Sequence, residues 1–364
     1  MANKEEAKGL AALRRQIDQL DEQLLELLNR RATLAMEVAQ VKQAAGENGA
    51  FWRPEREAEV LQRVMTRNPG PLDSETVAWL FRELMSACLA LERPLTVAYL
   101  GPAGTFTQMA ATKHFGQGAR LTPVSSIPEV FRTVQAGQAD FGVVPVENST
   151  EGSVNLTLDH LLDYPLKVCG EVQLRVVHNL VSAGVPLADM QRIYVHYQTR
   201  AQCRHWLAEH APRVQLVEVA SNAEAALRAR EDAAGGAIST TAAAELYGLR
   251  ILAAGIEDDA ENATRFLVIG DLDVQPTGRD KTSLVLSSHN RPGSLHELLR
   301  PLAAAGISMT RIESRPARRG LWQYVFFLDL EGHAKDLAVA AALAELQEKA
   351  TFYKLLGAYP KAVI

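Results

Sequence analysis

The stretch Pro145-Val146-Glu147-Asn148-Ser149-Thr150-Glu151-Gly152 places a carboxylate, an amide and two hydroxyl groups directly after an apolar run. That run, residues 141–144, has the length of a buried strand, so the polar groups are expected at a strand's carboxyl end. Loops and helix N-termini at this end of an α/β sheet present N–H groups, which favours an oxygen-rich anionic ligand. The alternative is a polar loop that only begins the helix expected at 155–162.

The length and composition of the chain indicate a soluble protein of two or three domains. It has 364 residues and a net charge of -5, which gives no basic surface for nucleic acid. No apolar run is long enough to span a membrane, and residues 1–9 lack the apolar core of a signal peptide, so a cytoplasmic location is expected. Cys88, Cys169 and Cys203 lack Cys-x-x-Cys spacing and the histidines lack helical zinc-site spacing, so neither disulfides nor a metal site is expected.

Residues 10–42 contain neither glycine nor proline, and their leucines and valines recur at helical spacing. They predict a single helix of about 50 Å. Two further helices are expected at 55–66 and 74–91, separated by Asn68-Pro69-Gly70-Pro71. Nothing else in this segment is long enough to cover the long helix except a second copy, so we expect a homodimer or a higher homo-oligomer.

Three basic residues of the long helix are placed unusually. Arg31 and Lys42 share one face, whereas Arg14 is rotated by roughly 100° from Arg31. One helix cannot direct all three to one place, but in an antiparallel pair Arg14 of one chain enters a pocket around Arg31 and Lys42 of the other. The alternative is a solvated basic face paired with acidic neighbours.

The motif Leu13-Arg14-Arg15-Gln16-Ile17-Asp18, with Arg31, Lys42 and Arg53-Pro54-Glu55-Arg56-Glu57, resembles the all-helical chorismate mutases over residues 10–92. The resemblance implies that Arg14 (from the partner), Arg31 and Arg56 hold the two carboxylates of chorismate. It also implies that Lys42 and Glu57 contact the ether oxygen and the ring hydroxyl. The implied substrate site consists of Arg14 from the partner, Arg31, Lys42, Arg53, Arg56, Glu57, Cys88 and Glu92.

The chemistry of a Claisen rearrangement agrees with these residues. The reaction needs no nucleophile and no cofactor, but it needs the enolpyruvyl arm folded over the ring and positive charge near the ether oxygen. Lys42 and Glu92 are the expected catalytic residues. Cys88 stands where the best-known bacterial form has a serine and Glu92 where it has a glutamine, so Glu92 must be protonated to donate a hydrogen bond.

A second segment begins after Pro94 with a strand at 95–100 and the turn Gly101-Pro102-Ala103-Gly104-Thr105-Phe106-Thr107. The turn lacks the lysine of a nucleotide-binding phosphate loop and the third glycine of the dinucleotide motif, so a helix N-terminus that accepts a carboxylate is favoured. Strands and helices then alternate to residue 269, which predicts two α/β lobes with mostly parallel sheets and a polar cleft between them.

Five motifs of this segment together resemble the prephenate dehydratases over residues 96–270, and the resemblance implies the two-lobed fold of periplasmic binding proteins. They are residues 101–106, 145–152, His196-Tyr197-Gln198 with Ala201-Gln202-Cys203, Ser221-Asn222-Ala223-Glu224-Ala225, and Thr264-Arg265-Phe266. Val195 and Tyr197 depart from the serine and proline often seen beside the histidine.

Prephenate loses carbon dioxide and its ring hydroxyl, so a hydrogen-bond donor near that hydroxyl and a cation for the remaining carboxylate are required. The resemblance implies Thr264 as the catalytic threonine, and Arg265 is the expected carboxylate partner. Glu147 is the acid if burial keeps it protonated, whereas Asn148 and Ser149 are candidates for positioning the ring. The expected substrate site consists of Thr105, Glu147, Asn148, Ser149, Gln198, Thr264, Arg265 and Phe266.

The last eighty residues predict a βαββαβ order, the ferredoxin-like arrangement. Pro292-Gly293-Ser294-Leu295 and Glu313-Ser314-Arg315-Pro316 resemble the ACT domains that bind phenylalanine. The alternative is a module that only dimerises. The expected effector site consists of Asn290, Pro292, Gly293, Ser294, Leu295, Glu313, Ser314 and Arg315.

These expectations combine into a multidomain chain: an all-α mutase domain (1–93), an α/β two-lobed dehydratase domain (94–275) and an α+β ACT domain (276–364). We expect a bifunctional enzyme that converts chorismate to prephenate and then to phenylpyruvate, without a cofactor and with L-phenylalanine as inhibitor. The partners are therefore small molecules and further copies of the chain, with no nucleic acid and no membrane. The alternatives are a sensor of aromatic acids without catalysis, and a mutase with an inactive dehydratase domain.

Overall fold

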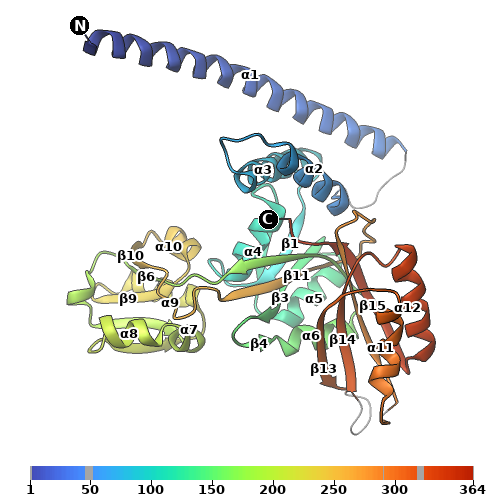
Figure 1. The fold of residues 1–364 in the computed structure, drawn as a ribbon. Coiled ribbons are helices and arrows are strands. Elements are labelled where there is room, and N and C mark those ends of the chain that lie inside the picture. The colour runs from blue at the N-terminus through green and yellow to red at the C-terminus, as the bar shows by residue number, and fades with distance from the viewer. Residues whose placement is uncertain (1, 46–51, 290, 318–323, 364) are drawn as a thin grey trace.

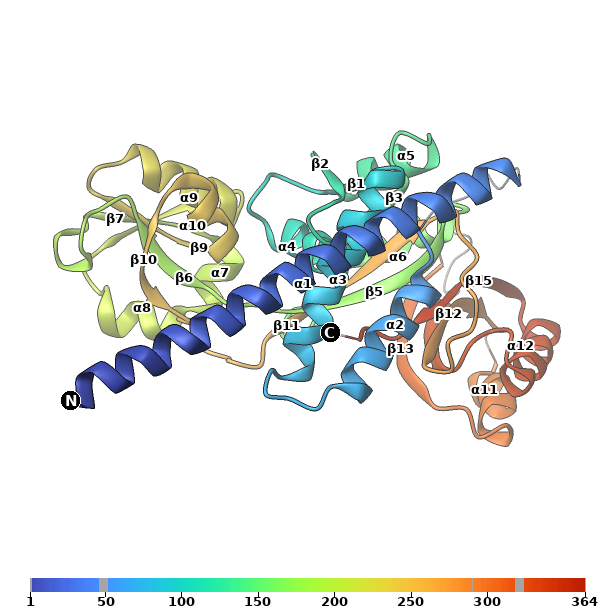
Figure 2. The same ribbon diagram turned by 90° about the horizontal axis from the view of Figure 1, so that it is seen from above.

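The computed structural model describes residues 2–45, 52–289, 291–317 and 324–363. Figure 1 shows a helical N-terminal part, two α/β lobes joined by extended segments, and a C-terminal sheet with two helices on its outer face. The long first helix extends away from the other elements, and Figure 2 shows that it runs across the molecule. This multidomain architecture confirms the predicted fold class.

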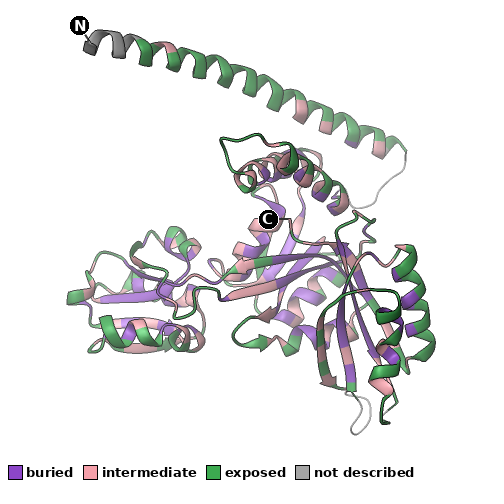
Figure 3. Cartoon of the chain, viewed as in Figure 1, coloured by how far each residue is buried: buried purple, intermediate pink, exposed green. Residues whose placement is uncertain are grey.

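The N-terminal part consists of α1 (Ala2–Ala44), α2 (Pro54–Arg67) and α3 (Ser74–Glu92). Pro54 occupies the first turn of α2, where its missing N–H costs nothing, and the Asp73 side chain caps α3 by accepting from Thr76 N at 2.8 Å. Leu13, Ile17 and other apolar residues of α1 are more than half exposed, and Figure 3 shows this helix almost entirely exposed. A single chain therefore leaves the apolar face of α1 uncovered.

The first α/β lobe contains a sheet in the order β2-β1-β3-β11-β5, with the short β4 beside β3. Its strands are β1 (Thr96–Leu100), β2 (Arg120–Val124), β3 (Phe141–Asn148), β4 (Gly152–Ser153), β5 (Lys167–Arg175) and β11 (Ala263–Gly270). Its helices are α4 (Phe106–Phe115), α5 (Ile127–Gln135) and α6 (Asn155–Asp163).

The second lobe contains a sheet in the order β10-β6-β9-β7-β8. Its strands are β6 (Asn179–Ser182), β7 (Arg192–His196), β8 (Gln215–Val219), β9 (Gly235–Ser239) and β10 (Arg250–Ala254). Its helices are the 3-10 turn η1 (Leu187–Asp189), α7 (Tyr197–Gln202), α8 (Arg204–His210), α9 (Asn222–Glu231) and α10 (Thr241–Tyr247).

The prediction of mostly parallel sheets was wrong, because both sheets are mixed. β1 is parallel to β2 and β3, but β11 is antiparallel to β3 and β5, and β6 is antiparallel to β9 and β10. The chain crosses between the lobes twice, so β11 returns to the first lobe in the direction opposite to its neighbours. The two crossing segments pair through Val176 N to Asn262 O at 2.8 Å and Ile256 N to His178 O at 2.9 Å.

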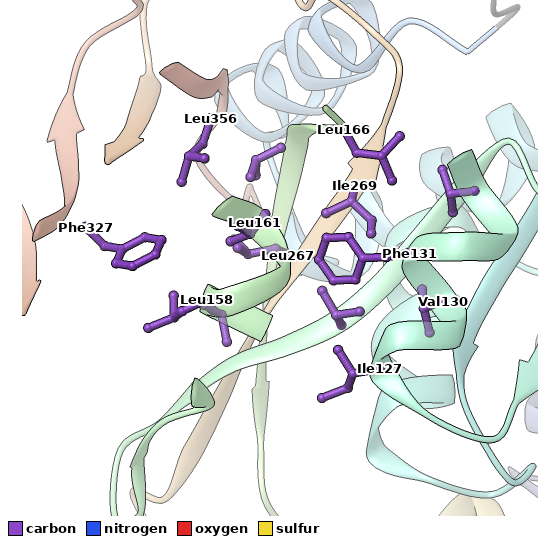
Figure 4. Close-up of a cluster of buried hydrophobic side chains, with 14 of the residues drawn as sticks. Ile127, Val130, Phe131, Leu158, Leu161, Leu166, Leu267, Ile269, Phe327 and Leu356 are labelled. Carbon is purple, nitrogen blue, oxygen red and sulfur yellow. The ribbon is translucent and has the colours of Figure 1, made fainter. Parts of the chain in front are cut away.

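The C-terminal part has the predicted βαββαβ order and an antiparallel sheet β13-β14-β12-β15. Its elements are β12 (Asp280–Ser287), α11 (Ser294–Ala304), β13 (Met309–Pro316), β14 (Tyr324–Glu331), α12 (Leu337–Lys349) and β15 (Phe352–Pro360). Phe327 and Leu356 of this sheet join one buried cluster with Leu158 and Leu161 of α6, as Figure 4 shows. The C-terminal sheet and the first lobe therefore share a hydrophobic core.

Candidate active sites

The helical part contains a cavity of about 460 Å³, which lies within the usual size range of small-molecule sites. It is lined from α1, α2, α3 and the residues between them, and also by Leu95 and by Phe115 of α4. Of the eight residues expected there, seven line it: Arg31, Lys42, Arg53, Arg56, Glu57, Cys88 and Glu92. With Arg82, five cationic side chains surround the cavity, which matches a substrate with two carboxylates.

Arg14 is the eighth expected residue, and a single chain does not bring it to this cavity. It is exposed on α1, and the rise per residue of a helix puts it about 26 Å along α1 from Arg31.

In the cavity lining, Arg31 Nη1 donates to Cys88 Sγ at 2.9 Å, so the cysteine lies beside one of the guanidinium groups of the cavity. Burial raises the pKa of the Glu92 carboxyl, and the neighbouring Lys42 partly opposes that rise. The direction of this shift is the one that a hydrogen-bond-donating Glu92 requires.

Glu57 is held at both carboxylate oxygens. Trp52 Nε1 donates to Oε2 at 2.9 Å and Arg82 Nε donates to Oε1 at 3.0 Å. Sequence reasoning missed both donors. Arg82 was detectable, because it lies on the helix face that also carries the buried residues Ala78 and Ser86, where an arginine needs a partner.

The two-lobed part brings Thr264 beside Asn148, since the two residues are paired between β11 and β3. Asn148 Nδ2 donates to Thr264 Oγ1 at 2.9 Å and to Asn262 Oδ1 at 2.8 Å, while its Oδ1 accepts from the N–H groups of Thr150 and Glu151. Because Thr264 accepts this bond, its own hydroxyl proton remains available for a ligand. Asn262, which is 1 % exposed, was not predicted.

Thr264 and Arg265 lie inside β11. The pairing of β11 with β3 shifts by one residue between Arg265 and Phe266, which leaves Val146 as the extra residue of a bulge. Phe266 is 1 % exposed and packs in the core of the lobe. The structure thus places the Phe266 ring in the core, not at the surface of a substrate site.

Arg265 lies in a different environment from the expected one. Its guanidinium donates to Glu171 Oε2 at 2.9 Å, to Asp329 Oδ2 at 2.5 Å and to the Tyr359 hydroxyl at 3.0 Å. Lys281 Nζ lies 2.8 Å from Glu171 Oε1 in the same cluster. Arg265 therefore connects β11 to the C-terminal sheet in this structure, and its donors are engaged by protein acceptors.

Glu147 is also engaged. Its Oε2 lies 2.9 Å from Nε of Arg311 on β13, and the side chain is 39 % exposed. Neither the burial nor the contact matches a protonated acid, because the ion pair uses Glu147 as a carboxylate. Ser149 accepts from Ala263 N at 3.0 Å and donates to Asn262 at 3.3 Å, so it stabilises the loop around Asn148.

The remaining expected dehydratase residues come from both lobes. Thr105 caps the N-terminus of α4, which presents N–H groups to an anion, and Gln198 lies half-buried in α7 of the second lobe. The lobes touch where Thr240 Oγ1 donates to Gly104 O at 2.7 Å. Gly104 has a φ of +86°, and an added Cβ would lie 2.9 Å from the Ala243 Cβ, so this contact requires glycine.

The two effector motifs lie at the same end of the C-terminal sheet, because Leu286, Phe326 and Ser314 form one row across β12, β14 and β13. Ser294 lines a cavity of about 320 Å³. Gly293, with a φ of +80°, begins α11 after Pro292, and Leu295 lies in its first turn. Asn290 lies outside the described residues.

The second effector motif faces the dehydratase part. Glu313 Oε2 accepts from Ser153 Oγ at 2.9 Å, and Arg315 Nη2 lies 2.9 Å from Asp159 Oδ1. Ser314, which alternates with these residues on β13, is exposed.

The described helices include none with the length and apolar character needed to cross a bilayer. Cys88, Cys169 and Cys203 are buried free thiols.

Three family models match the chain: chorismate mutase type II over residues 13–93, prephenate dehydratase over 97–273 and the ACT domain over 282–348. The bifunctional chorismate mutase/prephenate dehydratase of Pseudomonas aeruginosa PAO1 is 55 % identical over 359 residues, which cover 98 % of each chain. The enzyme of the same name from Stutzerimonas stutzeri is 53 % identical over 363 residues, covering 99 % of this chain and 100 % of the relative.

A solved structure of a prephenate dehydratase from Arthrobacter aurescens, in complex with L-Phe, superposes with a TM-score of 0.68 at 37 % identity. The superposition covers 73 % of this chain and 90 % of the other. The match of all three models in order, together with identity above half over nearly the full length, shows that this chain belongs to the bifunctional chorismate mutase/prephenate dehydratase family.

Proposed function

We propose that the chain rearranges chorismate to prephenate in the helical cavity and dehydrates prephenate to phenylpyruvate between the two lobes, under inhibition by L-phenylalanine. With boundaries after residues 93 and 275, the first part carries the mutase, the second the dehydratase and the third the regulation. The observation that carries the proposal is the cavity lined by Arg31, Lys42, Arg56, Glu57 and Glu92.

In the mutase step the ether C–O bond of chorismate breaks while a C–C bond forms, and no proton is transferred. Arg31, Arg56 and the partner subunit's Arg14 hold the two carboxylates, which folds the enolpyruvyl arm over the ring. Arg56 is available for this role, because its pairing with Glu59 is an exposed surface contact. Lys42 and protonated Glu92 face the ether oxygen, where negative charge develops.

In the dehydratase step the C–C bond to the ring carboxylate breaks and releases carbon dioxide, and its electron pair completes the aromatic ring. The ring hydroxyl leaves as hydroxide, which takes a proton from solvent to become water. Thr264 donates a hydrogen bond to that hydroxyl. Asn148 donates to Thr264 Oγ1, so the Thr264 hydroxyl proton points away from Asn148 and toward the substrate. The N-terminus of α4, capped by Thr105, supplies N–H groups for the pyruvyl carboxylate. Arg265 is left out of this substrate site, since its donors are engaged by Glu171, Asp329 and Tyr359.

The assembly and the regulation are part of the same proposal. A second copy covers the apolar face of α1 and brings Arg14 to the cavity, so the working form is a homodimer or a larger homo-oligomer in the cytoplasm. The match to the ACT model and the L-Phe complex of the Arthrobacter aurescens dehydratase support phenylalanine as the effector of the C-terminal part.

A single assay tests the proposal. Purified enzyme with chorismate as the sole substrate is expected to produce phenylpyruvate. Accumulation of prephenate would leave only the mutase, and unchanged chorismate would leave a sensor without catalysis.

A further inference from the structure

The carboxylate of Glu57 is fixed by two buried donors that lie outside the mutase motifs. Arg82 Nε donates to one oxygen at 3.0 Å and Trp52 Nε1 donates to the other at 2.9 Å. Arg82 is 6 % exposed and Trp52 is 4 % exposed. Each carboxylate oxygen retains a lone pair for a further hydrogen bond, so these contacts orient Glu57 without saturating it.

Arg82 is itself anchored on the dehydratase part. Its Nη1 donates at 3.1 Å to the carbonyl oxygen of Lys113 in the last turn of α4. Carbonyl groups at a helix C-terminus lack helical partners and attract cations. The guanidinium therefore bridges a carbonyl of the dehydratase part and a carboxylate of the mutase cavity.

The contact between α3 and the end of α4 is close. Ser86, one turn from Arg82, donates to Phe115 O at 2.6 Å and accepts from Gly118 N at 3.0 Å. A Cβ added to Gly116 would lie 2.6 Å from the Ser86 Cβ, and one added to Gly118 would lie 2.5 Å from the Ser86 carbonyl oxygen. Only glycines permit this approach, so the position of Arg82 relative to α4 is tightly defined.

Trp52 is anchored on the same lobe through its ring. The centroid of its ring lies 4.8 Å from that of Phe141 on β3, 5.0 Å from that of Phe115 and 5.4 Å from that of His114. Burial lowers the pKa of His114 to about 3, so this neighbour is neutral at physiological pH and does not compete for the Glu57 carboxylate.

We propose that Arg82 and Trp52 are positioning residues of the mutase reaction, and that the first lobe of the dehydratase sets the orientation of Glu57 through them. The inference rests on the proposed mutase function, in which Glu57 receives the ring hydroxyl of chorismate. It goes beyond that function, because it makes the geometry of the mutase site depend on the domain that carries the dehydratase site. Arg82 and Trp52 touch the carboxylate, not the reacting atoms, and so act through Glu57.

The first test replaces Arg82 in the full-length enzyme. Arg82→Gln is expected to lower mutase kcat/KM by about 10- to 100-fold, the effect of misplacing a binding group by about 1 Å. Dehydratase activity with added prephenate is expected to stay at the parental value. The control is Arg63→Gln, which removes the same charge from an exposed position of α2 and is expected to keep parental mutase activity.

The second test removes the hydrogen bond but keeps an aromatic ring in place. Trp52→Phe keeps an aromatic ring against Phe115 and Phe141 but removes the N–H group that reaches Glu57. We expect mutase kcat/KM to fall by about 3- to 10-fold, since a hydrogen bond to a charged group is lost. This variant keeps the inference testable even if Arg82→Gln disturbs the docking of the two parts.

The third test separates positioning from general stabilisation. In a Glu57→Gln background, Arg82→Gln is expected to cause less than a twofold further loss, because residues that act as a unit are not additive. The same fold loss in both backgrounds, or parental mutase activity in both Arg82→Gln and Trp52→Phe, would overturn the inference. A parental rate for Glu57→Gln alone would instead remove Glu57 from the proposed mutase site and the inference with it.

Discussion

Arg311 Nε lies 2.9 Å from Glu147 Oε2, which joins β13 of the C-terminal sheet to the end of β3, where Asn148 lies. Arg311 Nη2 also donates to Ser153 Oγ at 2.7 Å, and Ser153 donates to Glu313 of the expected effector motif. A continuous chain of polar contacts therefore runs from Glu313 to Glu147. Glu147 is the chain neighbour of Asn148, which donates a hydrogen bond to Thr264.

Arg311→Gln is expected to weaken inhibition by phenylalanine. Coupling between two sites requires contacts that differ between two states, and this variant removes the ion pair that links them. The concentration of phenylalanine that halves dehydratase activity should rise by about 5-fold or more. The control Arg132→Gln alters an exposed arginine of α5 and should leave inhibition by phenylalanine unchanged. If phenylalanine inhibited Arg311→Gln as strongly as the parent enzyme, the proposed coupling would be contradicted.

Thr264→Ala is expected to lower dehydratase kcat by about 10²- to 10⁴-fold, because it removes the hydrogen-bond donor assigned to the leaving hydroxyl. Conversion of chorismate to prephenate by the same preparation serves as the folding control and should be unaffected. Dehydration at the parental rate would take Thr264 out of the mechanism.

Mutase activity is expected to fall as pH rises through the pKa of Glu92. Burial raises that pKa above its usual value, and the protonated form, which donates to the ether oxygen, is present below it. Glu92→Gln carries a permanent donor and should flatten the profile of kcat/KM against pH. A profile in the variant that still falls like that of the parent would mean that another group titrates.

Arg265→Met is expected to destabilise the junction between the dehydratase and ACT parts by about 3–5 kcal/mol, because it leaves Asp329 buried without its guanidinium partner, while Glu171 keeps only its ion pair with Lys281. The free energy of unfolding in urea measures this loss. Arg200→Gln breaks an exposed ion pair with Glu218 and should cost no more than about 1 kcal/mol. A loss of the same size in both variants would argue against a stabilising role for Arg265.

Periodic patterns predicted the long elements well. The leucines of α1 and the alternating strands of the C-terminal sheet follow from helical and strand periods. The strands β6 and β10 were missed, because they have four and five residues and β10 is a largely exposed edge strand. Strand direction was also missed, since a hydrophobic pattern is the same whichever way a strand runs.

The residues of the candidate sites were also predicted only in part. Motif residues such as Arg31 and Lys42 were placed in one cavity from their spacing. Arg82 and Asn262 were not found, because their importance depends on what another domain or strand places beside them. Arg265 was assigned to substrate from its motif, while its contacts with Asp329 and Tyr359 depend on how the ACT sheet docks.

The central claim is that each mutase site combines a cavity of one subunit with Arg14 of the other. Arg14→Ala and Lys42→Ala enzymes are each expected to be almost inactive, but a mixture that exchanges subunits forms hybrid dimers. In each hybrid one site has an intact cavity and the partner's Arg14. Random pairing should then restore about a quarter of the parental mutase activity. Activity that stays at the level of the separate variants after demonstrated subunit exchange would contradict the claim.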